Sequence, residues 1–230
     1  MIIPSYNPIN TLGIGLGNPI EYSKIEIGSA VLHLGCSTGD DSFAIRRIVG
    51  ETGRVIGIDY DINNIAISRQ NCGNFGYSNV TFFVRDIEKL LFDNENFDVV
   101  VCNYSINLMP NKSNILKEIN RVLKINGKLI ISDLLPNKTI PDDFNNKICG
   151  KYQQIVKSNL NNFTKLLTNN EYILLLNNHN FFDTKINTER TINADDGELL
   201  LYIDYENISK WHELAIELYK IVSYSVKRNV

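Results

Sequence analysis

The sequence of 230 residues contains no long apolar run, no excess of one charge and no metal-binding motif. Its longest apolar runs, Tyr172–Leu176 and Leu199–Ile203, have five residues each, whereas a helix that spans a membrane needs about 20. The 23 Lys and Arg residues nearly balance the 26 Asp and Glu residues, without a block of like charge. These absences argue against a membrane protein and against one that binds nucleic acid through charge.

Cysteine is scarce and scattered. The cysteines form no Cys-x-x-Cys pair and have no histidine at metal-ligand spacing. We therefore expect buried, reduced thiols in a cytosolic protein and no bound metal, with a thiolate site as the alternative. The start of the chain lacks the charged and apolar regions of a signal peptide, which predicts a cytoplasmic location. The cysteines are Cys36, Cys72, Cys102 and Cys149.

Strand and helix patterns alternate from residue 28 to about residue 190. Such alternation predicts a parallel sheet that is covered by helices on both faces. The expected strands are Ala30–Leu34, Val55–Ile58, Val80–Val84, Phe97–Cys102 and Lys128–Ser132, and the helices between them are Asp41–Val49, Ile62–Cys72 and Asn114–Lys124.

The last third of the chain adds weaker patterns. Helices are expected at Asn161–Leu167, Tyr172–Asn177 and Trp211–Tyr219, a strand at Asp183–Thr188, and an antiparallel strand at Lys220–Lys227. The predicted fold is α/β: a Rossmann-like, doubly wound, mostly parallel seven-stranded sheet with helices on both faces and an antiparallel C-terminal strand.

Three loops at the carboxyl ends of the expected strands carry groups that suit an adenosine-containing ligand. The first has small residues at Gly35, Ser37 and Gly39, which let the backbone approach a ligand closely. The second ends in Asp59, whose carboxylate can accept hydrogen bonds from two ribose hydroxyls. The third carries Asp86. A dinucleotide fingerprint would read G-x-G-x-x-G, so the spacing favours S-adenosylmethionine over NAD.

At this point the sequence resembles the class I S-adenosylmethionine-dependent methyltransferases, and most closely their arsenite methyltransferase branch. The resemblance extends over residues 11–135, with a weaker tail to residue 190. It is carried by Leu12–Pro19, Val31–Asp41, Gly53–Asp59, Asn79–Phe82, Asp98–Asn103, Ile106–Leu108 and Arg121–Lys124.

The resemblance implies a set of cofactor contacts. Asp59 would hold the ribose, Asp41 would lie near the amino group of the methionine part, and Asn103 would lie below the sulfonium. Two positions depart from the family pattern: His33 replaces an Asp, and Ser37 replaces a Gly. His33 could contact the cofactor or could be an ordinary histidine at the edge of the core. The full set is Gly17, Asn18, His33, Gly35, Ser37, Gly39, Asp41, Asp59, Tyr60, Asp86, Ile87 and Asn103.

The resemblance does not extend to the arsenic ligands. Arsenite methyltransferases bind trivalent arsenic through cysteine thiolates, the soft ligands that this ion prefers. The matching positions here are Ser42, Tyr104 and approximately Gln154. Arsenic is therefore not the acceptor that we expect.

A methyltransferase acting on a small molecule or a short peptide is the predicted function. The acceptor would lie over the loops after the fourth and fifth strands, with Tyr104 and Asp133 as the candidate catalytic residues; Tyr104 could instead be an aromatic side chain that only fills the space.

A single domain over residues 1–230 is expected, with 1–28 as a lid that contacts the cofactor and 136–170 as a cover on the acceptor side. The cover contains aromatic residues (Phe144, Tyr152 and Phe163), for which ordinary helix core is the alternative.

Neither nucleic acid nor a membrane is expected as a partner, and the protein would be a monomer or a homodimer. The main alternative is a homologue that binds the cofactor for a regulatory role and has lost catalysis. A dehydrogenase would require affinity for NAD. His179 and His212 are expected at the surface, away from the cofactor.

Overall fold

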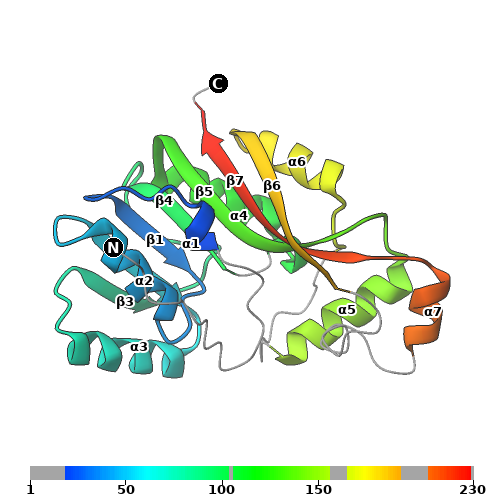
Figure 1. Cartoon of the computed structure of the whole chain (residues 1–230), viewed down its shortest axis with the longest axis horizontal. Helices are drawn as coiled ribbons and strands as arrows, with labels where there is room; N and C mark the ends of the chain where they lie inside the picture. The colour runs from blue at the N-terminus through cyan, green and yellow to red at the C-terminus, as the bar shows by residue number, and fades with distance from the viewer. Residues whose placement is uncertain (1–18, 104–105, 156–164, 193–206, 229–230) are drawn as a thin grey trace.

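The computed structural model describes residues 19–103, 106–155, 165–192 and 207–228 (Figure 1). Its strands are β1 (Ala30–Leu34), β2 (Arg54–Asp59), β3 (Val80–Val84), β4 (Phe97–Cys102), β5 (Leu123–Pro136), β6 (Phe181–Ile192) and β7 (Leu218–Lys227). Its helices are α1 (Pro19–Tyr22), α2 (Asp40–Val49), α3 (Ile62–Phe75), the 3₁₀ turn η1 (Ile106–Leu108), α4 (Lys112–Val122), α5 (Asp142–Ile155), α6 (Asn169–Asn177) and α7 (Ile208–Glu213).

The strands form one seven-stranded sheet in the order β3-β2-β1-β4-β5-β7-β6. Neighbouring strands from β3 to β5 are parallel, and β7 is antiparallel to both β5 and β6. The predicted fold class, including its antiparallel C-terminal strand, is confirmed. The chain moves outward from β1 to β2 and β3 and then returns to β4 on the other side of β1. Ligands of open α/β sheets bind beyond the carboxyl ends of the strands at such a reversal.

The parallel strands are buried on both faces because their alternate residues enter two different cores. Val31 packs into the cluster that contains residues of α2 and α3, whereas Leu32 and Leu34 pack into the cluster that contains residues of α4, α5 and α6. β4 repeats the pattern, with Val99 on the first face and Val100 on the second. A strand that is buried in this way presents only its carboxyl end to a ligand.

α5 and α7 lie next to each other at one end of the molecule (Figure 1). Phe144 of α5 and Trp211 of α7 are both buried, and their ring centroids are 6.1 Å apart. The packing of Phe144 between α5 and α7 favours the alternative of ordinary helix core for this residue, whereas the cover over residues 136–170 stays a prediction. The side chain of Tyr152 and all of Phe163 lie outside the described residues.

The late elements differ most from the sequence expectations. The helix expected over Trp211–Tyr219 ends at Glu213, because Ala215 adopts a positive φ of 45° and the next residues pair with β5. The helix expected over Asn161–Leu167 falls partly outside the described residues. Its last residues are not helical, since the N–H groups of Leu166 and Leu167 donate to side chains of α5 and η1.

β5 begins earlier and ends later than the expected strand, and Asn126 (φ 62°) marks an irregularity within it. In the part of the chain that the structure describes, no helix combines the length and the apolar character that crossing a membrane requires.

The Trp211 indole provides a test of the α5–α7 contact. We expect Trp211→Ala to lower the free energy of unfolding by about 3–5 kcal/mol, because it deletes a fully buried ring and leaves a cavity. Trp211→Phe should cost clearly less, since it keeps a ring and removes a buried indole N–H that has no partner among the described residues. Urea unfolding followed by circular dichroism measures both, and losses below about 1 kcal/mol for the two variants would contradict a shared core.

Candidate active site

The loop after β1 adopts a left-handed backbone conformation at alternate residues. Gly35, Ser37 and Gly39 have φ values of 67°, 48° and 98°. A Cβ on Gly39 would lie 3.0 Å from the rings of both Phe43 and Phe82, so only glycine fits there without displacing a ring. The loop leads directly into the amino end of α2, where backbone N–H groups favour polar or anionic ligand groups.

Asp59, at the end of β2, is hydrogen-bonded to this loop. Its Oδ2 accepts the N–H of Ser37 at 2.9 Å, and its Oδ1 accepts the N–H of Asp61 at 2.9 Å. Burial raises the pKa of the Asp59 carboxyl, and these two N–H groups oppose the rise. The structure thus brings together two of the predicted groups, the small-residue loop and the carboxylate, at the reversal of the sheet.

A buried polar cluster joins β1, α2 and β4 beside the loop. His33 Nδ1 lies 2.8 Å from Ser42 Oγ, and Asn103 Nδ2 donates to Asp41 Oδ2 at 2.8 Å. His33 Nε2 lies 3.9 Å from the same oxygen of Asp41. Two buried atoms of the cluster, His33 Nε2 and Asn103 Oδ1, have no hydrogen-bond partner among the described residues. Orphaned buried polar atoms are uncommon in folded proteins, and a water, an ion or a ligand group is the usual partner of such an atom.

Burial sets the charges in this cluster. It lowers the pKa of His33 to about 4, so the imidazole is neutral at pH 7 and its contact with Asp41 is not an ion pair. Burial also raises the pKa of Asp41, against the hydrogen bond from Asn103. At neutral pH, Asp41 and the unpartnered Asn103 oxygen can accept hydrogen bonds from a cationic ligand group. The cluster contains no positive charge that would repel such a group, because His33 is neutral.

Where the sequence predicts the acceptor, the structure is organised around Asn107 of η1. Its N–H donates to Asp133 Oδ1 and Oδ2 at 3.2 and 3.0 Å. Its side-chain amide donates to the carbonyls of Leu134 and Leu167 and accepts the N–H of Leu167. Asp133 is fully buried, and its Oδ1 also accepts the N–H of Leu134 at 2.9 Å. This geometry favours Asp133 as an anchor for the loop after β4, whereas a role as general base stays a prediction.

The remaining predicted residues lie at the rim or outside the described parts of the chain. Tyr60 is 51% exposed after β2, and Ile87 is partly buried against the core. Asp86 Oδ1 accepts the N–H of Glu88 and so forms a turn after β3. Gly17, Asn18 and Tyr104 lie outside the described residues, as does most of the expected N-terminal lid.

Sequence reasoning missed the contribution of Phe82 and Gly57 to the floor of the site. Gly57 lies in β2 and Phe82 in the neighbouring strand β3. A Cβ on Gly57 would lie 2.6 Å from the Phe82 ring, so this ring packs directly against the backbone of Gly57. The available signal was a glycine inside a buried strand, which indicates close approach of another group.

The fold and the paired loop and carboxylate define a Rossmann-like α/β protein with a site at the reversal of its sheet. The family model described as a methyltransferase domain matches residues 25–196. The chain therefore belongs to the methyltransferase domain family, and the prediction of a class I S-adenosylmethionine-dependent methyltransferase, with S-adenosylmethionine as the cofactor of that class, is confirmed.

Relatives place the chain near the arsenite methyltransferase branch. It is 36% identical over 132 residues to the arsenite methyltransferase of Halobacterium salinarum, a match covering 57% of this chain and 34% of the relative. The human arsenite methyltransferase is 37% identical over 122 residues, covering 49% and 32%. A ubiquinone/menaquinone biosynthesis C-methyltransferase of Blochmanniella pennsylvanica is 32% identical over 151 residues, covering 63% and 59%. The matched part of this chain thus spans only about a third of the arsenite methyltransferases.

Solved structures show the same fold. An arsenic(III) S-adenosylmethionine methyltransferase from Chlamydomonas reinhardtii aligns with a TM-score of 0.67 and 22% identity, over 96% of this chain and 75% of the other. A Haemonchus contortus phosphoethanolamine N-methyltransferase in complex with S-adenosylmethionine aligns with a TM-score of 0.63 and 18% identity, over 96% and 53%.

The neutral, buried His33 predicts a pH dependence of stability. Its pKa of about 4 in the folded protein lies below the ordinary histidine value of 6.5, so the unfolded state binds the proton more tightly. The contribution is fully present above about pH 6.5 and is lost as the pH falls toward 4, by about 3 kcal/mol in total. Urea unfolding of the wild type and of His33→Gln at pH 7.5 and pH 5 measures this loss.

His33→Gln should flatten the profile between pH 5 and 6.5. The raised pKa of Asp41 acts with the opposite sign: its contribution is fully present below the ordinary Asp pKa and is lost as the pH rises through the raised pKa of the folded state. Both proteins keep Asp41, so the difference between their two profiles reports His33. An unchanged slope in His33→Gln would contradict the assignment to His33.

Proposed function

We propose that this chain transfers a methyl group from S-adenosylmethionine to a small-molecule acceptor. The observation that carries the proposal is the hydrogen bond between the Asp59 carboxylate and the Ser37 N–H, because it places a hydroxyl-binding acceptor against a loop that a ligand can approach closely. The loop also adopts its left-handed conformation at Ser37 without a glycine. This departure from the family pattern therefore leaves the backbone of the loop intact.

The residues of the site fit this cofactor. In the proposed arrangement Asp59 accepts the ribose hydroxyls, while Asp41 and the unpartnered oxygen of Asn103 receive the ammonium or sulfonium part. Tyr60 and Ile87 would flank the adenine. The remaining proposed contacts are Gly17, Asn18, His33, Gly35, Ser37, Gly39 and Asp86.

When bound, the cofactor supplies a methyl carbon that its sulfonium already activates. The residues of this chain bind and orient it, exclude water and hold the acceptor in line with the methyl group. Tyr104 is proposed to contact the acceptor, and Asp133 to fix the loop that carries Tyr104, through the backbone of Asn107. No step in this account requires a strong base, which suits an acceptor that is nucleophilic when neutral.

A small molecule is favoured because the relatives are named for arsenite and for quinone precursors. The three cysteines whose side chains the structure describes give no support to arsenite as the acceptor of this chain. Cys36, Cys72 and Cys102 are all buried, and burial raises the pKa values of Cys36 and Cys72, which keeps these two as thiols. Ser42, at a position where the family binds arsenic, is instead bonded to His33.

Titration calorimetry with S-adenosylmethionine tests the proposal. Asp59→Asn should weaken binding by at least about tenfold, because it removes a charged acceptor, whose hydrogen bonds are worth roughly 1.5–3 kcal/mol. Asp61→Asn is the matched control: it makes the same change two residues away, at the amino end of α3, where Asn caps a helix as well as Asp does. Its affinity should stay within about twofold of the wild type.

Turnover separates the competing functions. Transfer of a labelled methyl group to an amine or quinol supports the proposal, and transfer to arsenite would overturn the choice of acceptor. Tight binding without transfer to any acceptor of a broad panel would support the alternative, a homologue that binds the cofactor for a regulatory role. A folded wild-type protein that binds no S-adenosylmethionine would contradict both.

A further inference from the structure

The connection between β3 and β4, residues 85–96, contains neither a helix nor a strand, although it carries two of the proposed adenine contacts, Asp86 and Ile87. Its start is tied to the site, since the N–H of Arg85 donates to the Asp59 carbonyl at 2.9 Å. Without regular structure of its own, this segment needs external partners to keep one conformation. We call residues 86–94 the adenine loop.

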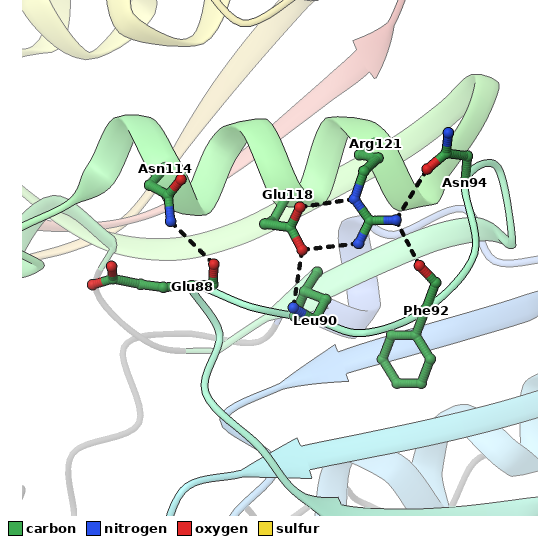
Figure 2. Close-up of polar contacts among 7 residues, drawn as sticks. All are labelled: Glu88, Leu90, Phe92, Asn94, Asn114, Glu118 and Arg121. Atoms are coloured by element: carbon green, nitrogen blue, oxygen red, sulfur yellow. Dashed lines mark hydrogen bonds and ion pairs between the residues drawn. The ribbon is translucent and has the colours of Figure 1, made fainter.

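Polar side chains of α4 supply those partners (Figure 2). Asn114 donates to the carbonyl of Glu88 at 3.0 Å, and Glu118 Oε2 accepts the N–H of Leu90 at 3.0 Å. Arg121 Nη1 donates to the carbonyl of Phe92 at 2.5 Å. Backbone groups of three alternate loop residues are therefore held by helix residues spaced four and three apart, which share one face of α4.

Glu118 and Arg121 form the centre of this contact. Arg121 Nε donates to Glu118 Oε1 at 2.7 Å and Nη2 donates to Oε2 at 2.8 Å, a bidentate pair. The remaining guanidinium nitrogen, Nη1, also contacts Asn94 Oδ1 at 3.0 Å. Because two parallel hydrogen bonds fix the orientation of both side chains, each of them can hold a backbone group of the loop in a defined place.

Apolar packing also holds the adenine loop against α4. Leu90 is fully buried and belongs to the core cluster that contains Ile115 and Ile119 of α4. α4 thus binds the sheet with its apolar stripe and the adenine loop with its polar stripe. From Glu88 the bonding continues to the site, because Asp86 Oδ1 accepts the N–H of Glu88 and the Asp86 carbonyl accepts the N–H of Lys89.

We propose that the Glu118–Arg121 pair is a positioning device that sets the affinity of the site for the adenosine half of the cofactor, by holding the adenine loop along α4. The inference rests on the proposed function and adds to it two positioning residues that touch neither cofactor nor acceptor. Their removal should weaken cofactor binding and leave the transfer step intact at saturation.

The test compares Arg121→Ala, Arg121→Lys and Glu118→Ala with the wild type. The two alanine variants should raise Kd and KM for S-adenosylmethionine by about tenfold, the cost of roughly one charge-assisted hydrogen bond. Their kcat at saturating cofactor should stay within about twofold, since the transfer step needs only the methionine end in place. Arg121→Lys keeps the charge but loses the fork, so its Kd should lie between those of the wild type and Arg121→Ala.

Lys124→Met is the matched control. It removes an ion pair with the same separation of 2.7 Å, between Lys124 and Asp98, that has no contact with the adenine loop. Its Kd should remain within about twofold of the wild type. An equal loss in Lys124→Met would show that any lost ion pair weakens binding through stability, and would overturn the positioning role.

Hydrogen exchange in the free protein supplies a readout that does not depend on the cofactor. The amide of Leu90, bonded to Glu118, should lose protection in Glu118→Ala, while amides of β1 keep theirs. Unchanged Leu90 exchange, or unchanged Kd in a folded Arg121→Ala, overturns the inference.

If alanine variants do not fold, Asn114→Ala tests the same contact at its exposed end, with a smaller rise in Kd expected. Failure of the wild type to bind contradicts the proposed function instead.

Discussion

The hydrogen bond from the Ser37 N–H to the Asp59 carboxylate is the contact on which the rest of the site depends. It joins the loop after β1 to the end of β2 across 22 residues of sequence. The bond forms only because the loop turns through left-handed conformations, and because β1 and β2 pair in register up to Leu34 and Ile58. The sheet therefore supplies a fixed frame, and the carboxylate and the loop backbone are positioned before any ligand arrives.

Around this contact, the site separates into parts that are held by different elements. The cluster of His33, Ser42, Asp41 and Asn103 joins β1, α2 and β4 and remains free of positive charge at neutral pH. Where the acceptor is expected, the Asn107 side chain binds the backbone of Leu134 and Leu167, and the Asn107 N–H binds the Asp133 carboxylate. These two parts are fixed by buried or partly buried hydrogen bonds rather than by exposed ion pairs, so their geometry should depend little on ionic strength.

Much of the fold follows from sequence periodicity, because buried parallel strands have continuous apolar runs. β1, β3 and β4 have the bounds that the runs at Ala30–Leu34, Val80–Val84 and Phe97–Cys102 indicate. The end of α7 and the conformation of residues 165–167 could not be predicted in this way. They depend on Ala215 in an unusual conformation and on side chains of distant residues, Asn107 and Asn145, that bind the backbone.

The candidate site likewise has parts that the sequence predicts and parts that it does not. The loop and Asp59 were predictable because spacing alone brings the ends of neighbouring strands together. The partners of Asp133 were not, because a carboxylate after a strand has the same sequence signal whether it faces a ligand or a backbone N–H. The polar stripe of α4 was equally hidden, since charged residues on one helix face are also typical of a solvent-exposed surface.

A crystal structure of the protein with bound S-adenosylhomocysteine would show whether Asp59 and the loop after β1 hold the cofactor. We expect the ribose hydroxyls within hydrogen-bond distance of Asp59, the adenine between Tyr60 and Ile87, and the amino group beside Asp41. A ligand bound away from the carboxyl ends of β1 and β2, or one that leaves Asp59 bonded only to backbone N–H groups, would contradict this expectation.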